Sequence, residues 1–159
     1  MSRVLPSVTD LTSLLSSLTG RAVHLKATPP YVFANDKAAL VAAYTTDDGV
    51  LGATLVSDLT FAASAGAALT MISAEVVMEC AADGEMTERI LENAHEVLNV
   101  AATLFNQPGS SHLVLGQVAG AGSELPAPLA QLLAKPGHRM DLEGMIEGYP
   151  KGRLSILLP

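Results

Sequence analysis

The sequence EMTERILENAHEVLNVAATLFN, residues 85 to 106, decides the fold that we expect for this chain. At about 100° per residue its apolar positions gather on one side, which predicts one amphipathic helix packed on a core. The side chains expected on the buried side are Ile90, Leu91, Ala94, Val97, Leu98, Ala101, Leu104 and Phe105. Asp83 and Gly84 are its predicted cap, and the sequence QPG that follows ends it, because proline cannot continue a helix.

The opposite side of this helix is polar, with residues at steps of three and four that form one line. The line consists of Glu85, Glu88, Glu92, Glu96, Asn99, Thr103 and Asn106. Glu88, Glu92 and Glu96 are like charges one turn apart, and each such pair costs an isolated helix roughly 0.2–0.5 kcal/mol. Helix stability therefore does not explain the line. It is either a solvated acidic face or a surface that docks on a cation.

Two members of the polar line, Glu96 and Asn99, form a Glu-x-x-Asn pair, which places a carboxylate beside an amide. A carboxylate can bind a lysine while the amide, which is both donor and acceptor, holds a water molecule. This pair on an amphipathic helix resembles the signature of the CheC/CheX/FliY phosphatases, which remove phosphate from the receiver-domain protein CheY in chemotaxis. The resemblance covers residues from about 38 to the C-terminus and is nearest to the CheX branch. CheC and FliY carry two such helices, whereas this chain has one.

The rest of the chain predicts short strands and helices in an order similar to that of CheX. The predicted helices are 11–18 (after Thr9 or Asp10), 59–72 (after Asp58), 73–82 and a turn at 129–134. The predicted strands are 21–28, a short piece at 31–33, the hairpin 38–44 and 50–57, then 112–118, and the hairpin 140–148 and 154–158. Adjacent hairpins predict an α/β (α+β) fold: a largely antiparallel sheet with helices packed on one face, CheC/CheX-like. We expect a single domain over residues 1–159.

Composition limits the possible partners and the compartment. The chain carries 16 acids and 9 bases, a net charge of −7, which argues against nucleic acid or an anionic membrane surface as a partner. Cys80 is the one cysteine, which excludes an intrachain disulfide and fits a reducing compartment. The charge-free run at 59–74 is shorter than the roughly 18–20 residues that span a bilayer. We therefore expect a soluble, cytoplasmic protein.

The resemblance implies an enzyme of two-component signalling, a protein aspartyl-phosphate phosphatase. Glu96 would bind a lysine of the phosphorylated receiver-domain protein, and Asn99 would orient the attacking water. Mg²⁺ would be bound by that partner, so no cofactor and no metal site is expected on this chain. Further contacts to the partner are expected from Glu88, Glu92, His95 and Thr103, with the acids acting by charge steering. CheX also suggests a homodimer.

The chain departs from the family pattern in three respects. Glu92 stands where the family often has Asp or Ser, and Thr103 stands where it often has Gly. The family also has a proline some two dozen residues after the Asn, and the prolines nearest to that place, Pro126 and Pro128, come slightly late. The bulk of Thr103 beside the site predicts an alternative, a non-catalytic binding module of the same fold that sequesters or senses a receiver domain. A third interpretation is an unrelated acidic α/β protein with an accidental Glu-x-x-Asn.

A metal centre is the other chemistry that this helix suggests, because Glu92 and His95 form a Glu-x-x-His. Di-iron bundles need two such units and two further glutamates, and only one unit is present. We therefore predict no metal site, and assign His95 to the rim of the polar face.

Overall fold

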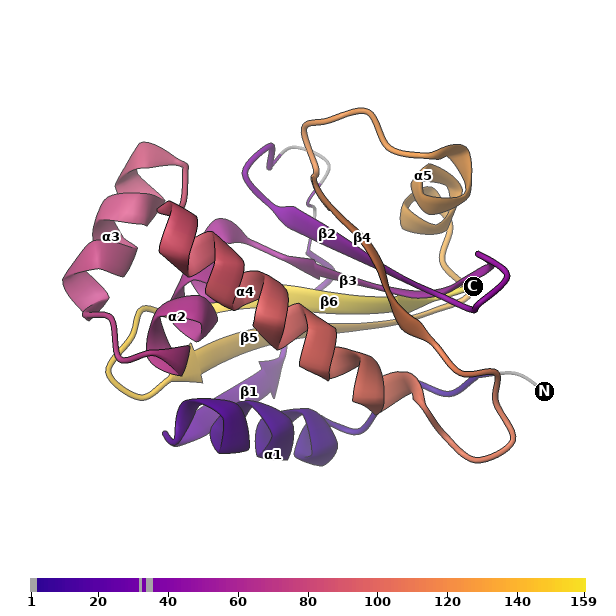
Figure 1. Ribbon diagram of the computed structural model, residues 1–159, viewed down its shortest axis with the longest axis horizontal. Helices are drawn as coiled ribbons and strands as arrows, with labels where there is room; N and C mark the ends of the chain where they lie inside the picture. Colours follow the sequence, from indigo (N-terminus) through magenta and orange to yellow (C-terminus); the bar gives the residue numbers. More distant parts are fainter. Residues whose placement is uncertain (1–2, 32, 34–35) are drawn as a thin grey trace.

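The computed structural model describes residues 3–31, 33 and 36–159, and its centre is one antiparallel sheet (Figure 1). The strands are β1 (Val23–Ala27), β2 (Leu40–Thr45), β3 (Leu51–Ser57), β4 (Val114–Gly120), β5 (His138–Ile146) and β6 (Gly152–Leu158), in the order β1-β5-β6-β3-β2-β4. Every neighbouring pair is antiparallel, and both predicted hairpins, β2–β3 and β5–β6, are present. The predicted piece at 31–33 includes Val32, which lies outside the described residues.

Helices cover the two faces of the sheet unequally. They are α1 (Val8–Thr19), α2 (Leu59–Leu69), α3 (Ala74–Asp83), α4 (Glu88–Ala101) with a 3₁₀ turn η2 (Ala102–Phe105), and α5 (Ala127–Ala134). The first four pack on one face through the larger of two apolar clusters, where α4 crosses the sheet (Figure 1). The α/β prediction with an antiparallel sheet is confirmed. The prediction that the helices pack on one face is correct for α1–α4. Helix α5 instead lies against the opposite face through Leu129.

Side-chain caps fix where the first two helices begin. Asp58 caps α2 as predicted, since its carboxylate accepts a hydrogen bond from the backbone N–H of Phe61 at 2.8 Å. Helix α1 begins earlier than predicted, because Ser7 and not Thr9 or Asp10 is its cap: the Ser7 hydroxyl accepts from the Asp10 N–H at 3.0 Å.

The small-residue helix α2 packs closely against α4, as its Ala- and Gly-rich sequence predicts. A Cβ added to Gly66 would stand 2.6 Å from the backbone oxygen of Ile90, so only glycine allows this approach. The Asn93 amide of α4 then donates to the Gly66 carbonyl at 2.9 Å and to the Thr70 hydroxyl at 2.8 Å. These contacts fix α4 rigidly to its neighbour.

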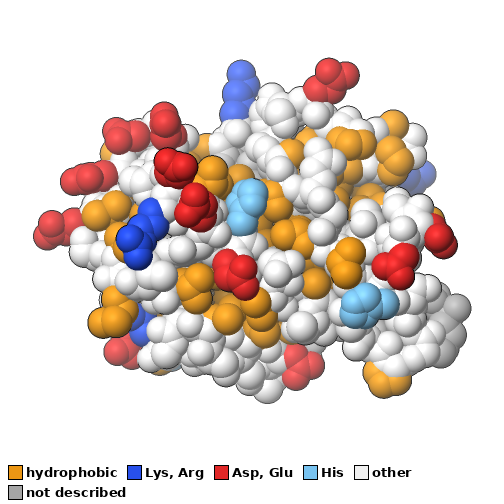
Figure 2. All heavy atoms as spheres, in the orientation of Figure 1, with side chains coloured by type: hydrophobic (Ala, Val, Ile, Leu, Met, Phe, Trp, Pro, Cys, Tyr) orange, Lys and Arg blue, Asp and Glu red, His pale blue; other side chains and the backbone are white. Residues whose placement is uncertain are grey.

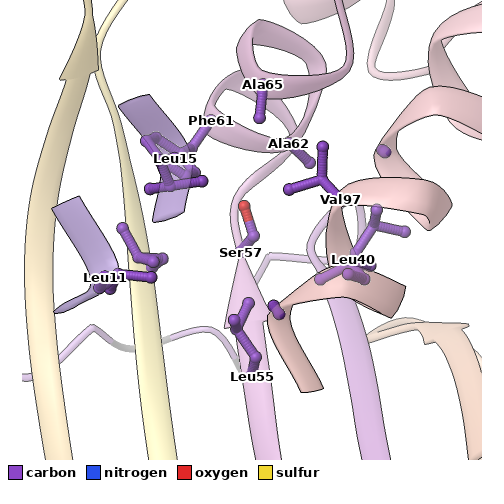
Figure 3. A pocket seen from close by; sticks show the side chains of 13 residues that line it. Leu11, Leu15, Leu40, Leu55, Ser57, Phe61, Ala62, Ala65 and Val97 are labelled. Carbon is purple, nitrogen blue, oxygen red and sulfur yellow. The ribbon is translucent and has the colours of Figure 1, made fainter. Parts of the chain in front are cut away.

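An apolar cavity of about 30 Å³ lies beneath α4, between α1, α2 and the sheet (Figure 3). Its walls are Leu11, Leu15, Leu40, Leu55, Ser57, Phe61, Ala62, Ala65, Ala94, Val97, Leu98, Ala101 and Leu154. The one polar side chain among them, Ser57, already donates its hydroxyl proton to the Asp58 carbonyl at 2.9 Å. A water molecule needs two to four polar partners, so the cavity is expected to be dry.

On the opposite face of the sheet, Asp141 is the centre of a buried polar cluster. Its carboxylate accepts hydrogen bonds from the Ser155 hydroxyl at 2.6 Å, from Nε and Nη2 of Arg139 at 2.9 and 2.8 Å, and from the Tyr31 N–H at 3.0 Å. Burial by itself would raise the pKa of the Asp141 carboxyl, but the hydrogen bonds from Arg139, Ser155 and Tyr31, together with the charge of Arg139, outweigh it, so this pKa is lowered.

Candidate functional site

Helix α4 begins three residues later than the sequence predicts. Thr87 is its cap, since the Thr87 hydroxyl accepts from the Ile90 N–H at 3.2 Å. Gly84, predicted to cap α4, instead ends α3 with φ +72°. Glu85 therefore precedes the helix, and Glu88 is the acid of its first turn, where the N-terminal end of the helix dipole favours negative charge.

The far end of the predicted polar line also differs from expectation. The α-helix ends at Ala101, so Thr103 lies on the 3₁₀ turn, where its hydroxyl donates to the Val100 carbonyl at 2.9 Å. The Asn106 amide does not face outward. It donates to the Leu113 carbonyl at 3.2 Å and accepts from the Leu113 N–H at 2.8 Å, which ties the end of the helix to β4.

The inward side of α4 anchors it to the core. Of the eight apolar residues predicted there, six are buried, Leu104 is half-buried, and Leu91 is 36% exposed. Tyr44 of β2 donates its hydroxyl proton to the Leu98 carbonyl at 2.7 Å, a buried hydrogen bond beneath the middle of the helix. The backbone under the Glu-x-x-Asn pair is thus held by packing and by a hydrogen bond.

The outward side of α4 carries every side chain that the sequence predicts for the site. Glu88, Glu92, His95, Glu96, Asn99 and Thr103 are all exposed. The first five of these form what we call the outward stripe. Among the described residues, no hydrogen bond or ion pair engages their side chains. The two ion pairs found among those residues, Arg139–Asp141 and Lys151–Glu143, lie in and beside the β5–β6 hairpin. Glu96 and Asn99 are therefore available to another molecule.

The negative charge of the protein is concentrated at this site. Residues 74–101 hold seven acids and one base, so they carry six of the seven net negative charges. Figure 2 shows acidic side chains gathered over α3 and the first half of α4. The neighbouring elements α2 and β4 contain no ionisable side chain, so the charges of α4 and α3 themselves set the local potential.

Neither a metal site nor a membrane span accompanies the stripe. Within residues 3–31, 33 and 36–159, no three His, Cys, Asp or Glu side chains are grouped so that they could bind a metal ion. The same part of the chain contains no helix long and apolar enough to cross a bilayer.

Sequence reasoning missed Asn93, which lies on the flank of α4 and joins it to α2 through two hydrogen bonds. The available signal was its place in the helix: Asn93 falls between the polar line and the apolar side. A half-buried amide needs partners, and α2 supplies them.

The comparisons with known proteins give structural matches and no sequence matches. No protein-family model matches this sequence, and no curated protein matches it significantly. The structure resembles FliY of Thermotoga maritima with a TM-score of 0.55 and 18% identity, over 92% of this chain and 81% of that one. A chain of the FliM–SpeE complex from H. pylori matches with a TM-score of 0.62 and 10% identity, over 95% of this chain and 80% of that one.

A third match is to a chain of the CheX–CheY–BeF₃–Mg²⁺ complex from Borrelia burgdorferi. Its TM-score is 0.52 at 12% identity, over 92% of this chain and 90% of that one. At identities this low, the structural matches establish a common fold alone. They extend over almost the whole chain. This chain has the fold of the CheC/CheX/FliY family, which FliM also has.

Proposed function

We propose that this chain is a phosphatase that hydrolyses the aspartyl phosphate of a receiver-domain response regulator. The observation that carries the proposal is the exposed Glu96–Asn99 pair, whose side chains have no partner among the described residues, on a helix held from beneath. The fold shared with FliY and with the CheX–CheY complex supports it. The CheX–CheY complex supports a CheY-like receiver as the partner.

The reaction requires positioning more than it requires reactive groups. Water attacks the phosphorus atom in line, the bond from phosphorus to the aspartate oxygen breaks, and the electron pair returns to the aspartate carboxylate. In the proposed complex, Glu96 binds a lysine of the regulator and Asn99 orients the water. The regulator supplies the Mg²⁺ ion, so this chain needs no cofactor of its own. Holding the water in line can supply a large part of the rate acceleration.

The remaining site residues have proposed roles in docking. Glu88 and Glu92 steer the cationic rim of the regulator's site toward α4, and His95 and Thr103 contact the same rim. On the resemblance to CheX, we also propose a cytoplasmic location and a homodimer. Sedimentation velocity measures the oligomeric state.

The test is the decay of phosphate on a receiver domain from the same organism, with and without this protein. The proposal expects faster decay with the wild type and a loss of about a hundredfold in Asn99→Ala, because a mispositioned water costs about that much. Glu96→Ala is expected to weaken binding as well. Gln131→Ala, which removes an exposed amide from α5 on the other side of the sheet, is the matched control. Decay unchanged by the wild type, or raised equally by Asn99→Ala, contradicts the proposal.

A second candidate, a binding module without turnover, is favoured by Thr103. Its side chain stands one turn beyond Asn99 where the family often has glycine, and bulk there can hold a partner away from the site. The FliM fold also occurs in complexes with other proteins, namely SpeE and FliG.

Shortening Thr103 separates the two candidates. For an enzyme partly obstructed by this side chain, Thr103→Gly and Thr103→Ala should both raise the phosphate decay rate a few-fold at unchanged affinity. Alanine is the necessary control, because glycine also costs a helix about 1 kcal/mol. Tight binding with no acceleration in the wild type or in either variant would favour the binding module.

A further inference from the structure

The outward stripe contains a side chain whose chemistry the Glu-x-x-Asn pair does not use. We propose that His95 is a second ligand of the water oriented by Asn99, and that its neutral imidazole accepts a proton from this water during attack. The inference rests on the proposed phosphatase function and adds a residue to it.

The geometry of α4 brings His95 and Asn99 together. They are four residues apart within one α-helix, so they lie on the same face, with Cβ atoms roughly 6 Å apart. Helical side chains lean toward the N-terminus, so the Asn99 amide lies over the turn that carries His95 and Glu96. Side chains at this spacing can bind the same water molecule. Both side chains are exposed, and neither has a partner among the described residues.

The charges that face His95 come from its own helix and from α3. The elements packed against α4 bring almost no charge: α2, β4 and η2 have no ionisable residue, and α1 has only Asp10. The charged groups of α4 itself and of α3 before it are Glu75, Glu79, Asp83, Glu88, Arg89, Glu92 and Glu96.

The chemistry assigns different tasks to the two water ligands. An amide donates and accepts hydrogen bonds but does not take up a proton, whereas a neutral imidazole nitrogen does. As the water oxygen bonds to phosphorus and the bond to the aspartate oxygen breaks, the electron pair leaves with the aspartate carboxylate. One water proton passes to His95 and then to solvent, and the phosphate departs. An imidazole that is already protonated has no nitrogen free to accept the proton. Its positive charge also repels the regulator's Mg²⁺ and lysine.

The experiment is a pH profile of receiver phosphate decay between about pH 5.5 and pH 8.5, spanning the range in which imidazole titrates. Each rate is divided by the spontaneous rate at the same pH. The proteins are the wild type, His95→Gln, Asn99→Ala and His112→Gln, the last removing an exposed histidine that lies outside α4. The wild-type acceleration should fall up to about tenfold per pH unit on the acid side. His95→Gln should be at least about tenfold slower at high pH and should lack the acid limb. His112→Gln should follow the wild type.

The outcomes separate this inference from the function on which it rests. An acid limb of the same midpoint in His95→Gln and in the wild type overturns the role of His95, as does an unchanged rate at high pH. In either case a loss in Asn99→Ala still supports the phosphatase. A wild type that never accelerates decay overturns both. Thermal unfolding of His95→Gln is the folding control, and affinity for the receiver with BeF₃ and Mg²⁺ shows whether docking alone has changed.

Discussion

Two polar clusters on opposite sides of the sheet use similar side chains in opposite ways. Around Asp141, every donor is directed at one carboxylate: Ser155, Arg139 and the Tyr31 backbone all bind it, and the residue is 9% exposed. On the outward stripe of α4, carboxylates, an imidazole and an amide face solvent, and no hydrogen bond or ion pair to another described residue engages them.

The difference separates a stabilising cluster from a surface whose polar groups remain available for the proposed partner. Hydrogen bonds that are complete within the chain contribute to folding and leave nothing for a partner. Like charges one turn apart weaken an isolated helix, so helix stability does not explain their presence on α4. Changes in the Asp141 cluster should therefore alter stability, whereas changes in the outward stripe should alter activity.

The largest stability effect should come from Asp141→Ala. Removing the carboxylate leaves Arg139 and the Ser155 hydroxyl without their partner, and breaking a buried pair typically costs about 3–5 kcal/mol. Arg139 is partly exposed and can recover water, so the expected loss in unfolding free energy is about 3 kcal/mol. Urea unfolding measures it, and phosphate decay per folded molecule should not change. A stable variant with reduced activity would reverse the distinction between the two clusters.

A smaller effect concerns pH. Because the folded pKa of Asp141 is lowered, its contribution to stability is present above the unfolded value of about 3.9 and is lost as pH falls through the folded pKa. The difference in unfolding free energy between wild type and Asp141→Asn should therefore shrink from about pH 6 to about pH 3. Burial raises the pKa of Asp58, which acts in the opposite direction, but both proteins contain Asp58, so its effect cancels. A difference that stays constant with pH would contradict the assigned cause.

The smallest effect should come from Glu92→Gln on the outward stripe. Removing one exposed charge should slow association with a receiver domain a few-fold, and the reduction should vanish as salt is raised, because exposed charges act at long range only at low ionic strength. Stability should change by less than about 0.5 kcal/mol. Glu147→Gln, an exposed acid outside α3 and α4, is the control. Equal effects of the two variants would mean that overall charge, and not the stripe, matters.

Local sequence patterns predicted most of the helices and strands. The features that they did not predict depend on contacts between residues far apart in the chain. The cap at Asp58, the two hairpins and the two sides of α4 follow from residues near one another in sequence. The pairing of β1 with β5 does not, since the paired residues Val23 and Ile146 are far apart in the chain and nothing local marks them as partners.

The candidate site was predictable for the same reason, because one helix carries it. The errors in that prediction lie at the two ends of the helix. At the N-terminal end, Thr87 and not Gly84 is the cap, because the Thr87 hydroxyl accepts a hydrogen bond from the Ile90 N–H. At the C-terminal end, the Asn106 side chain binds Leu113, which only the folded chain brings close to it. The Asp141 cluster was missed because Tyr31 is 110 residues away in the chain and because the pairing of Asp141 with Ser155 depends on the exact register of the β5–β6 hairpin.

The small apolar cavity beneath α4 has a consequence for how the molecule responds to hydrostatic compression (Figure 3). Unfolding lets solvent fill such a space, so the unfolded chain with its water occupies less volume than the native state. High pressure thus favours unfolding of the layer between α1, α2 and α4, because unfolding eliminates the cavity there. The helix bearing Glu96 and Asn99 therefore packs on a part of the core in which pressure favours unfolding.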